Sequence, residues 1–352
     1  MTDLLALTAQ LVGTPSESFH ETRLADLLEA DLRTVAALDV TRIGDNVVAR
    51  TDLGRAERVV LAGHTDTVPA VGGNERARVG GNTVWGVGAS DMKSGLAVML
   101  DLARSVAVPS VDVTWIFYAR EEVAAVHSGL GELAERRPDL LVGDLAVLGE
   151  PTDATIEAGC QGTMRADLVL AGTRAHTARP WMGRNAIHRM ADVLAAIVAV
   201  PERRPVLAGC EYREAIQAVA VEGGVADNVV PDRAALSINH RFAPDRTLDQ
   251  AFAHVRSVVE PFMADGDSLH LVNSAPAAPP AIDHPRLAAV IERRELEVRA
   301  KLGWTDVARF AALGIPAVNL GPGDPTLAHT PDEHVTRAPI EACHDVLVDL
   351  IG

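Results

Sequence analysis

The sequence predicts an α/β protein in which a mostly parallel sheet is flanked by helices and an α+β domain of ferredoxin-like topology is inserted. Two observations carry this prediction. In the first half, short apolar runs such as 59–63, 111–118 and 144–149 alternate with helical segments, as in parallel sheets covered on both faces. From about residue 164 onward, apolar and polar residues alternate, which is typical of strands with one face open to solvent.

Helical segments separate the apolar runs of the first half. Leu4, Leu7 and Leu11 form an apolar stripe that predicts an amphipathic helix near the N-terminus. A Gly-rich loop with a short hairpin follows the first strands, at residues 65–83. The segments that predict helices are 1–36, which holds two of them, 94–107 and 128–137.

The middle of the chain predicts the order strand, helix, strand, strand, helix, strand, which is the split βαβ pattern of ferredoxin-like domains. The proline-rich stretch 274–280, SAPAAPP, marks the return to the first domain. We therefore assign residues 1–171 and 279–352 to one domain and residues 172–278 to the inserted domain. The elements of the inserted pattern are predicted at 164–172, 185–200, 216–221, 234–242, 248–263 and 268–273.

Composition limits the partners and the compartment. A net charge of −16 argues against binding to nucleic acid and to anionic membrane surfaces. Cys160, Cys210 and Cys343 are widely spaced and form no C-x-x-C pair, so we expect reduced thiols in a cytoplasmic protein. The N-terminus carries an acid at Asp3 and no basic region, so it predicts no signal peptide. No apolar run reaches membrane-spanning length.

Polar side chains follow the apolar runs of the first half. Because ligands gather beyond the carboxyl ends of parallel strands, these side chains are expected to share one crevice. Unpaired carboxylates in a crevice are costly, so the cluster predicts a metal site. His329, in a loop after the strand predicted at 317–320, can add an imidazole. The residues of the cluster are His64, Asp66, Asp91, Glu121, Glu122 and Glu150.

Each of these signals alone has an ordinary alternative. Two adjacent acids at a strand end are often the start of a solvated loop, and a lone histidine in a loop is often a surface residue. Gly86-x-Gly88 resembles a dinucleotide fingerprint, but Asp91 stands where the third glycine should be. Cys160 has no adjacent base motif, which argues against a cysteine nucleophile.

Taken together, the motifs resemble the dizinc aminoacylase and carboxypeptidase family of metallohydrolases. They span essentially the whole chain in the order typical of that family. The matching motifs are H-T-D at 64–66, G-x-S-D-M-K-x-G at 88–95, the pair Glu121 and Glu122, E-P-T at 150–152, and the late His329.

The resemblance implies two zinc ions per subunit, with cobalt as a substitute metal. Glu121, next to a ligand, would be the general base, and Asp66 would orient His64. The peptide bond after Asp91 is expected to be cis. The implied ligands are His64, Asp91 and Glu150 for one ion, and Asp91, Glu122 and His329 for the other.

The resemblance also implies that the inserted domain is a lid and a homodimer interface. His176 would cross to the partner subunit and stabilise the oxyanion of the reaction. Trp304 stands where many relatives carry a smaller residue, near the expected acyl end of the substrate. For the arginines, a solvated surface position is the alternative. The implied substrate-binding residues are Arg179, Asn228, Arg241 and Thr305.

The implied reaction is hydrolysis of an amide bond in a small-molecule substrate. Three stretches match a branch of the family that converts N-succinyl-LL-2,6-diaminopimelate to succinate and LL-2,6-diaminopimelate: EAGCQGTMRADLVLAGTRAHTARPW, GGVADNVVPDRAALSINHRFAPDR and KLGWTDVARFAALGIPAVN. Deacetylation of N-acetylornithine and carboxypeptidase-like cleavage of peptides stay open as sister reactions. A non-catalytic relative is the third alternative; such a protein would be expected to lack Glu121 or a ligand, and none is missing.

Overall fold

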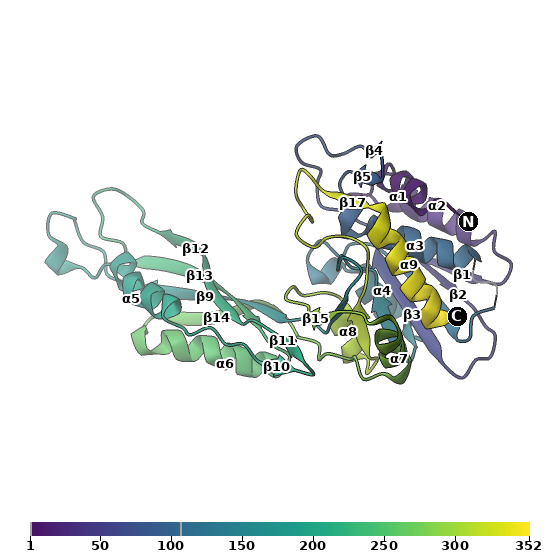
Figure 1. The fold of residues 1–352 in the computed structure, drawn as a ribbon. Coiled ribbons are helices and arrows are strands. Elements are labelled where there is room, and N and C mark those ends of the chain that lie inside the picture. The colour runs from purple at the N-terminus through teal and green to yellow at the C-terminus, as the bar shows by residue number, and fades with distance from the viewer. Residues whose placement is uncertain (1, 106–107) are drawn as a thin grey trace. The chain divides into compact units, whose positions relative to one another are not determined.

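The computed structural model describes residues 2–105 and 108–352 (Figure 1). The chain forms two compact units. Unit 1 comprises Met1–Ala158, Ala281–Arg299 and Arg309–Gly352, and unit 2 comprises Gly159–Pro280 and Ala300–Ala308. Within the described ranges, no helix combines the length and the apolarity needed to cross a bilayer.

Unit 1 is built on a sheet with a parallel centre and antiparallel edges. In sheet order the strands are β1 (Asp39–Ile43), β2 (Asn46–Arg50), β6 (Asp112–Tyr118), β3 (Arg58–His64), β7 (Leu145–Leu148), β16 (Ala317–Asn319), β8 (Ile156–Ala158) and β15 (Val298–Ala300). The central strands β6, β3, β7 and β16 are parallel neighbours, whereas β2 and β8 join them antiparallel. The predicted α/β fold with a parallel core is therefore confirmed.

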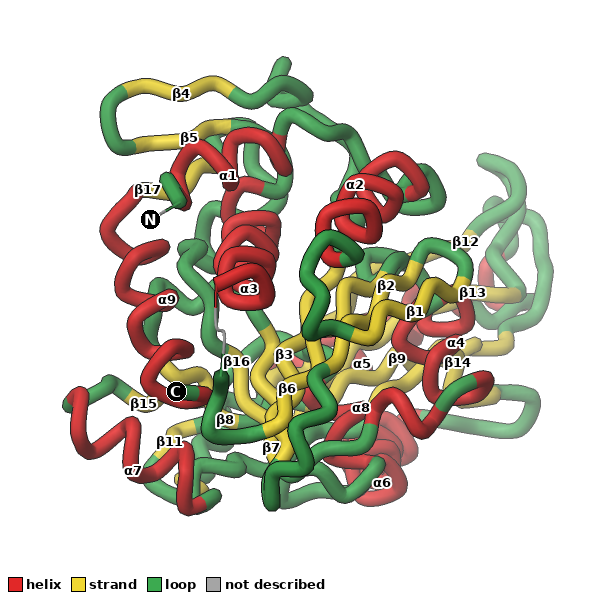
Figure 2. Tube along the Cα trace, turned by 90° about the vertical axis from the view of Figure 1, so that its right-hand side faces the viewer, coloured by secondary structure: helices red, strands yellow, loops and turns green. Residues whose placement is uncertain are grey.

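One set of helices shares a hydrophobic core with this sheet: α1 (Leu4–Val12), α2 (Thr22–Leu32), α3 (Ser94–Ser105), α7 (Pro285–Arg294) and α9 (Arg337–Ile351). Helix α3 contacts α1, α2 and α9, and Figure 2 shows α1, α3 and α9 close together beside the strands. The predicted stripe of Leu4, Leu7 and Leu11 is buried. Residues 106–107, the end of the helix predicted at 94–107, lie outside the described residues. Two further helices are α4 (Gly129–Arg136) and α8 (Val307–Ala312).

A small second sheet joins two distant parts of unit 1. It contains β4 (Arg78–Gly80), β5 (Thr83–Trp85) and β17 (His334–Thr336), with β5 in the middle. The antiparallel pair of β4 and β5 is the predicted short hairpin. Because β17 pairs with β5, the loop that carries His329 is tied to the segment that leads to Asp91.

Glycine allows the start of α3 to lie against the sheet. A Cβ atom at Gly95 would lie 2.3 Å from the carbonyl oxygen of Gly149. A backbone carbonyl cannot move aside as a flexible side chain can, so only glycine permits this close approach. The segment before α3, which holds Asp91, therefore stays close to the end of β7. Strand β7 leads to Glu150.

Unit 2 has the ferredoxin-like topology that the sequence predicts. Its elements follow the order β9 (Gly162–Ala171), α5 (Ala186–Val198), β12 (Ala215–Gly223), β13 (Arg233–Phe242), α6 (Leu248–Val259) and β14 (Ser268–Ala275), with a short hairpin of β10 (Val206–Leu207) and β11 (Cys210–Glu211) before β12. The sheet is antiparallel in the order β12-β13-β9-β14. Side chains from both helices and from one face of the sheet form a single core.

The boundary between the units differs from the predicted one. The sequence assigns residues 1–171 to the first domain and 172–278 to the insertion, but β9 belongs to unit 2. The physical reason is its pairing, because β9 hydrogen-bonds with β13 on one side and with β14 on the other. Residues 300–308 also belong to unit 2.

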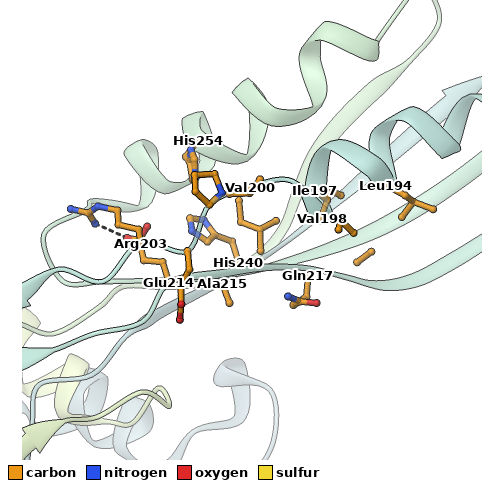
Figure 3. Close-up of a pocket in the computed structure, with 14 residues that line it drawn as sticks. Leu194, Ile197, Val198, Val200, Arg203, Glu214, Ala215, Gln217, His240 and His254 are labelled. Atoms are coloured by element: carbon orange, nitrogen blue, oxygen red, sulfur yellow. Dashed lines mark hydrogen bonds and ion pairs between the residues drawn. The ribbon is translucent and has the colours of Figure 1, made fainter.

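A cavity of about 630 Å³ lies in unit 2 beside α5 and β12 (Figure 3). The predicted site residues do not line it; His240 on β13 and His254 on α6 do, with ring centroids 5.6 Å apart. The side chain of His240 is fully buried, and neither ring nitrogen forms a hydrogen bond with a described residue. Burial lowers the pKa of His240 to about 4, although the charge of Glu214 and the carbonyl of Ala251 oppose this effect.

This buried imidazole predicts that unit 2 loses stability in mild acid. The folded-state pKa of His240 is lower than the ordinary value of 6.5, so between these pH values the unfolded state binds more protons. The free energy of unfolding should therefore fall by on the order of 2–3 kcal/mol as the pH drops from about 6.5 to about 4. His240→Leu should flatten this response, because leucine carries no group that titrates in this range.

The stability of unit 2 itself is measured by urea unfolding near pH 7 and near pH 5. Hydrogen–deuterium exchange in peptides of β13 and α6 monitors the unfolding. His270→Gln is the matched control, because His270 is exposed on β14. An unchanged pH dependence in His240→Leu would contradict the assignment.

Candidate metal centre

The candidate site is built at the carboxyl ends of the central parallel strands of unit 1. Strand β3 ends in His64, β6 leads to Glu121 and Glu122, and β7 leads to Glu150. These three strands are parallel neighbours in the order β6-β3-β7, so their ends lie at one edge of the sheet. Asp91 reaches the same place from the irregular segment Ala89–Lys93 in front of α3.

The structure brings the predicted ligands together in overlapping groups. In each group, one ligand atom per residue lies within 4.8 Å of the others. Asp91 is shared by two of the groups. The groups are His64, Asp91 and Glu150; His64, Glu121 and Glu122; and Asp91, Glu122 and His329.

The closest contacts join imidazoles to carboxylates. His64 Nε2 lies 3.1 Å from Asp91 Oδ1, and His329 Nε2 lies 2.9 Å from Glu122 Oε1 and 3.7 Å from Asp91 Oδ2. His64 and Glu150 are buried, whereas His329 is half-exposed. One side of the cluster is therefore enclosed and the other is open to a ligand.

The electrostatics show that this cluster attracts positive charge. Burial lowers the pKa of His64, but the carboxylates of Asp66 and Asp91 outweigh burial and raise it well above its ordinary value. The hydrogen bond to Glu122 raises the pKa of His329 to about 9 against the effect of burial. The surrounding carboxylates thus favour positive charge at both imidazoles. A divalent cation can supply the same charge.

The donor set fits a borderline metal ion. Imidazole nitrogen and carboxylate oxygen are together the usual ligands of zinc and of neighbouring transition metals, whereas calcium and magnesium prefer oxygen alone. His64 Nδ1 lies 3.0 Å from the backbone oxygen of Asp66, and this contact leaves Nε2 directed toward Asp91. A second-sphere contact of this kind fixes which nitrogen can bind a metal.

The side chain of Asp66 also binds the backbone of the two adjacent glutamates. Its carboxylate accepts hydrogen bonds from the backbone N–H groups of Glu121, at 3.0 Å, and Glu122, at 3.1 Å. It also accepts one from the hydroxyl of Ser18, at 2.7 Å, and lies 3.5 Å from His64 Nδ1. Burial raises the pKa of Asp66, but the hydrogen bond to His64 and its charge, together with the bonds from Glu121 and Ser18, outweigh burial and lower the pKa to about 2. Asp66 therefore stays ionised and holds the backbone of both glutamates.

Sequence reasoning assigned no role to three residues around this cluster, of which Glu333 and Lys93 are buried and Ser18 is partly exposed. Glu333 accepts hydrogen bonds from the N–H groups of Ser90 and Asp91. Lys93 is buried, donates to the carbonyl of Thr14 at 2.8 Å, and has a pKa lowered by burial to about 7. Ser18 reaches Asp66. The sequence signals were the position of Glu333 shortly after His329 and the place of Lys93 in the motif at 88–95. The peptide bond between Asp91 and Met92 is cis, as the resemblance implies.

The predicted residues of unit 2 form two groups. The backbone of Thr177 donates to Asn228, and the backbone of Arg179 donates to His176, so these segments lie side by side; His176, Arg179 and Asn228 are exposed. In the second group, the Cys160 thiol donates to the carbonyl of the buried Thr305, at 3.6 Å. Burial lowers the pKa of the half-buried Arg241, and the Cys160 thiol partly opposes this effect.

Comparison with known proteins identifies the family. A model of peptidase family M20/M25/M40 matches residues 60–352. A protein of Mycobacterium tuberculosis (strain ATCC 25618 / H37Rv) named putative succinyl-diaminopimelate desuccinylase DapE is 49% identical, over 99% of this chain and 98% of its own. The succinyl-diaminopimelate desuccinylase of Corynebacterium glutamicum is 43% identical, over 98% of this chain and 94% of its own.

Solved structures share the fold at lower identity. A tripeptidase from Staphylococcus aureus superposes with a TM-score of 0.80 at 20% identity, covering 99% of this chain and 97% of its own. An aminopeptidase from Bacillus cereus superposes with a TM-score of 0.81 at 18% identity, with the same coverage. The family model covers most of the chain and the two desuccinylases match nearly all of it, so the chain belongs to peptidase family M20/M25/M40.

Proposed function

We propose that the chain is a metal-dependent amidohydrolase that converts N-succinyl-LL-2,6-diaminopimelate to succinate and LL-2,6-diaminopimelate. The observation that carries the proposal is a pair of groups that share Asp91, each made of one imidazole and two carboxylates with ligand atoms within 4.8 Å of one another. Glu121 belongs to a third group, with His64 and Glu122. The desuccinylase names of two relatives that match almost the whole chain support the substrate. The three free cysteines support a reducing compartment, which we take to be the cytoplasm.

Two zinc ions per subunit would fit the donor set, with cobalt as a substitute. His64, Asp91 and Glu150 would hold one ion, and Asp91, Glu122 and His329 would hold the other. When bound, such ions polarise an amide carbonyl and make water acidic enough to attack it at neutral pH.

Glu121 would act as the general base. It would take a proton from the attacking water and return it to the leaving amine, which makes the amine a better leaving group. Its backbone N–H is held by Asp66, so the position from which its side chain extends is fixed. Its neighbour Glu122 faces His329. Of the two adjacent acids, Glu121 would therefore transfer the proton and Glu122 would bind metal.

Unit 2 would bind the rest of the substrate and stabilise the oxyanion. His176 is exposed, as a residue must be if it is to reach the active site of a partner subunit. Arg179 and Arg241 would bind carboxylates of the substrate, because a guanidinium forms paired hydrogen bonds with a carboxylate. Asn228 and Thr305 would add polar contacts.

A homodimer through unit 2 completes the proposal. Strand β12 lies at the edge of its sheet and presents valines such as Val219 and Val221, each 55% exposed. An open strand edge with apolar side chains favours pairing with a second strand. The strands at 164–172 and 216–242 are the proposed interface. Strand β12 would offer the open edge, whereas β9 is paired on both sides and would take part only through a face of the sheet.

Replacing the proposed base should abolish turnover while metal binding persists. Glu121→Gln removes the proton acceptor but keeps the size of the side chain, so turnover should fall by about 10²–10⁴-fold or more. Metal content measured by elemental analysis should stay at the wild-type value. Glu135→Gln is the matched control, because Glu135 is exposed on α4. Near-normal turnover in Glu121→Gln, or loss of metal, would count against this role.

A substrate panel tests the specificity. Zinc-loaded protein should hydrolyse N-succinyl-LL-2,6-diaminopimelate in preference to N-acetylornithine and to a set of dipeptides. Release of the primary amine measures all three reactions in the same assay. A preference for the acetyl or peptide substrate would leave the metal centre in place and replace the proposed substrate with that of a sister enzyme. Hydrolysis of none of them by metal-loaded protein would support a non-catalytic relative.

A further inference from the structure

We infer that Glu333 is a positioning residue that holds Asp91 in its metal-binding place; the inference rests on the metal centre of the proposed function. Glu333 lies just before β17, and its side chain is 1% exposed. Its Oε1 atom accepts hydrogen bonds from the backbone N–H of Ser90, at 2.9 Å, and of Asp91, at 3.0 Å. A single carboxylate oxygen thus binds two consecutive amides of the segment that presents the shared ligand.

The local backbone explains why Asp91 needs an outside partner. Within Ala89–Lys93, Asp91 and Met92 have non-helical backbone angles, so helical hydrogen bonds do not satisfy this turn in the usual way. Buried backbone N–H groups require an acceptor. Glu333 supplies it, and the hydroxyl of Ser90 adds a bond of 2.8 Å to the carbonyl of Asp324.

Asp66 offers an independent parallel within the same site. Its carboxylate accepts from two consecutive N–H groups, those of Glu121 and Glu122. Asp66 follows the ligand His64 in sequence and Glu333 follows the ligand His329, so each acid ties the segment of one ligand to the backbone of another. The repeated arrangement indicates that the bonds of Glu333 serve the geometry of the metal centre.

The anchoring of Glu333 makes it suitable for this role. Its own carbonyl accepts from the N–H of Gly86, at 3.1 Å, and the following strand β17 pairs with β5. The backbone on which Glu333 sits is therefore fixed with respect to the segment that leads to Asp91. A carboxylate on a fixed backbone can define the place of Asp91, whereas one on a free loop would follow it.

Three substitutions of Glu333 separate the effect of its hydrogen bonds from the effects of its charge and of its contribution to folding. Glu333→Gln keeps an Oε1 acceptor for both N–H groups, Glu333→Asp keeps the charge but withdraws the oxygens by one methylene, and Glu333→Ala removes the acceptor. The probe is zinc alone, and its dissociation constant is measured by competition with a chromogenic chelator. Asp332→Ala is the control, because Asp332 is the exposed neighbouring acid.

We expect Glu333→Asp and Glu333→Ala to weaken zinc binding by about 10–100-fold, as loss of outer-shell support for a ligand does. Glu333→Gln and Asp332→Ala should keep the wild-type affinity. Excess zinc should restore turnover to Glu333→Asp but not to Glu121→Gln, because only the first variant is limited by metal binding. Since zinc also stabilises a weakened fold, the wild-type zinc affinity of Glu333→Gln is the readout that separates the hydrogen bonds from a structural role. If Glu333→Ala does not fold, the comparison of the Asp and Gln variants decides.

Wild-type zinc affinity in Glu333→Asp would overturn the inference, as would equal losses in Glu333→Gln and Glu333→Asp. These outcomes differ from failure of the proposed function, because the zinc titration does not depend on the substrate. A wild-type protein that binds zinc but hydrolyses no succinyl substrate leaves the inference intact. A wild-type protein that binds no zinc would refute both.

Discussion

The crowding of carboxylates at the carboxyl ends of β3, β6 and β7 is the constraint on which the rest of unit 1 depends. Asp91, Glu122 and Glu150 each place an oxygen within 4.8 Å of an imidazole nitrogen. Negative charges this close disfavour the folded state unless positive charge accompanies them. The carboxylates raise the pKa of His64 and of His329 and so favour positive charge there, and metal ions can provide the same charge. The fold therefore carries a built-in affinity for cations at this edge of the sheet.

Holding such a cluster together requires support from outside the ligands. The close approach of Gly95 to the Gly149 carbonyl keeps the start of α3 near the end of β7. The carboxylates of Asp66 and Glu333 then bind backbone amides of the ligand segments. Because these contacts act on backbone groups, they fix where a ligand side chain begins and leave its end free to adapt to an ion.

The sequence predicted the parts of the site that follow from strand geometry. Polar residues after parallel strands must meet at one edge, which is why His64, Glu122 and Glu150 could be grouped before any coordinates were known. Glu333 could not be found in this way, because its role depends on hydrogen bonds to amides far away in sequence. The error at β9 is of another kind. The sequence predicted the strand at 164–172 as the first element of the inserted pattern, but the domain boundary was drawn at its end, whereas the pairing of β9 with β13 and β14 puts the boundary before it.

Two fully buried histidines show how the surrounding charge distinguishes a metal-site residue from a residue of the hydrophobic core. Burial lowers the pKa of both His64 and His240. At His64 the carboxylates of Asp66 and Asp91 reverse the effect. At His240 the nearby Glu214 is already engaged by Arg203 and Arg246, so burial prevails. Uncompensated negative charge around a buried imidazole thus favours a proton or a metal ion on the ring. Burial without such charge favours the neutral ring.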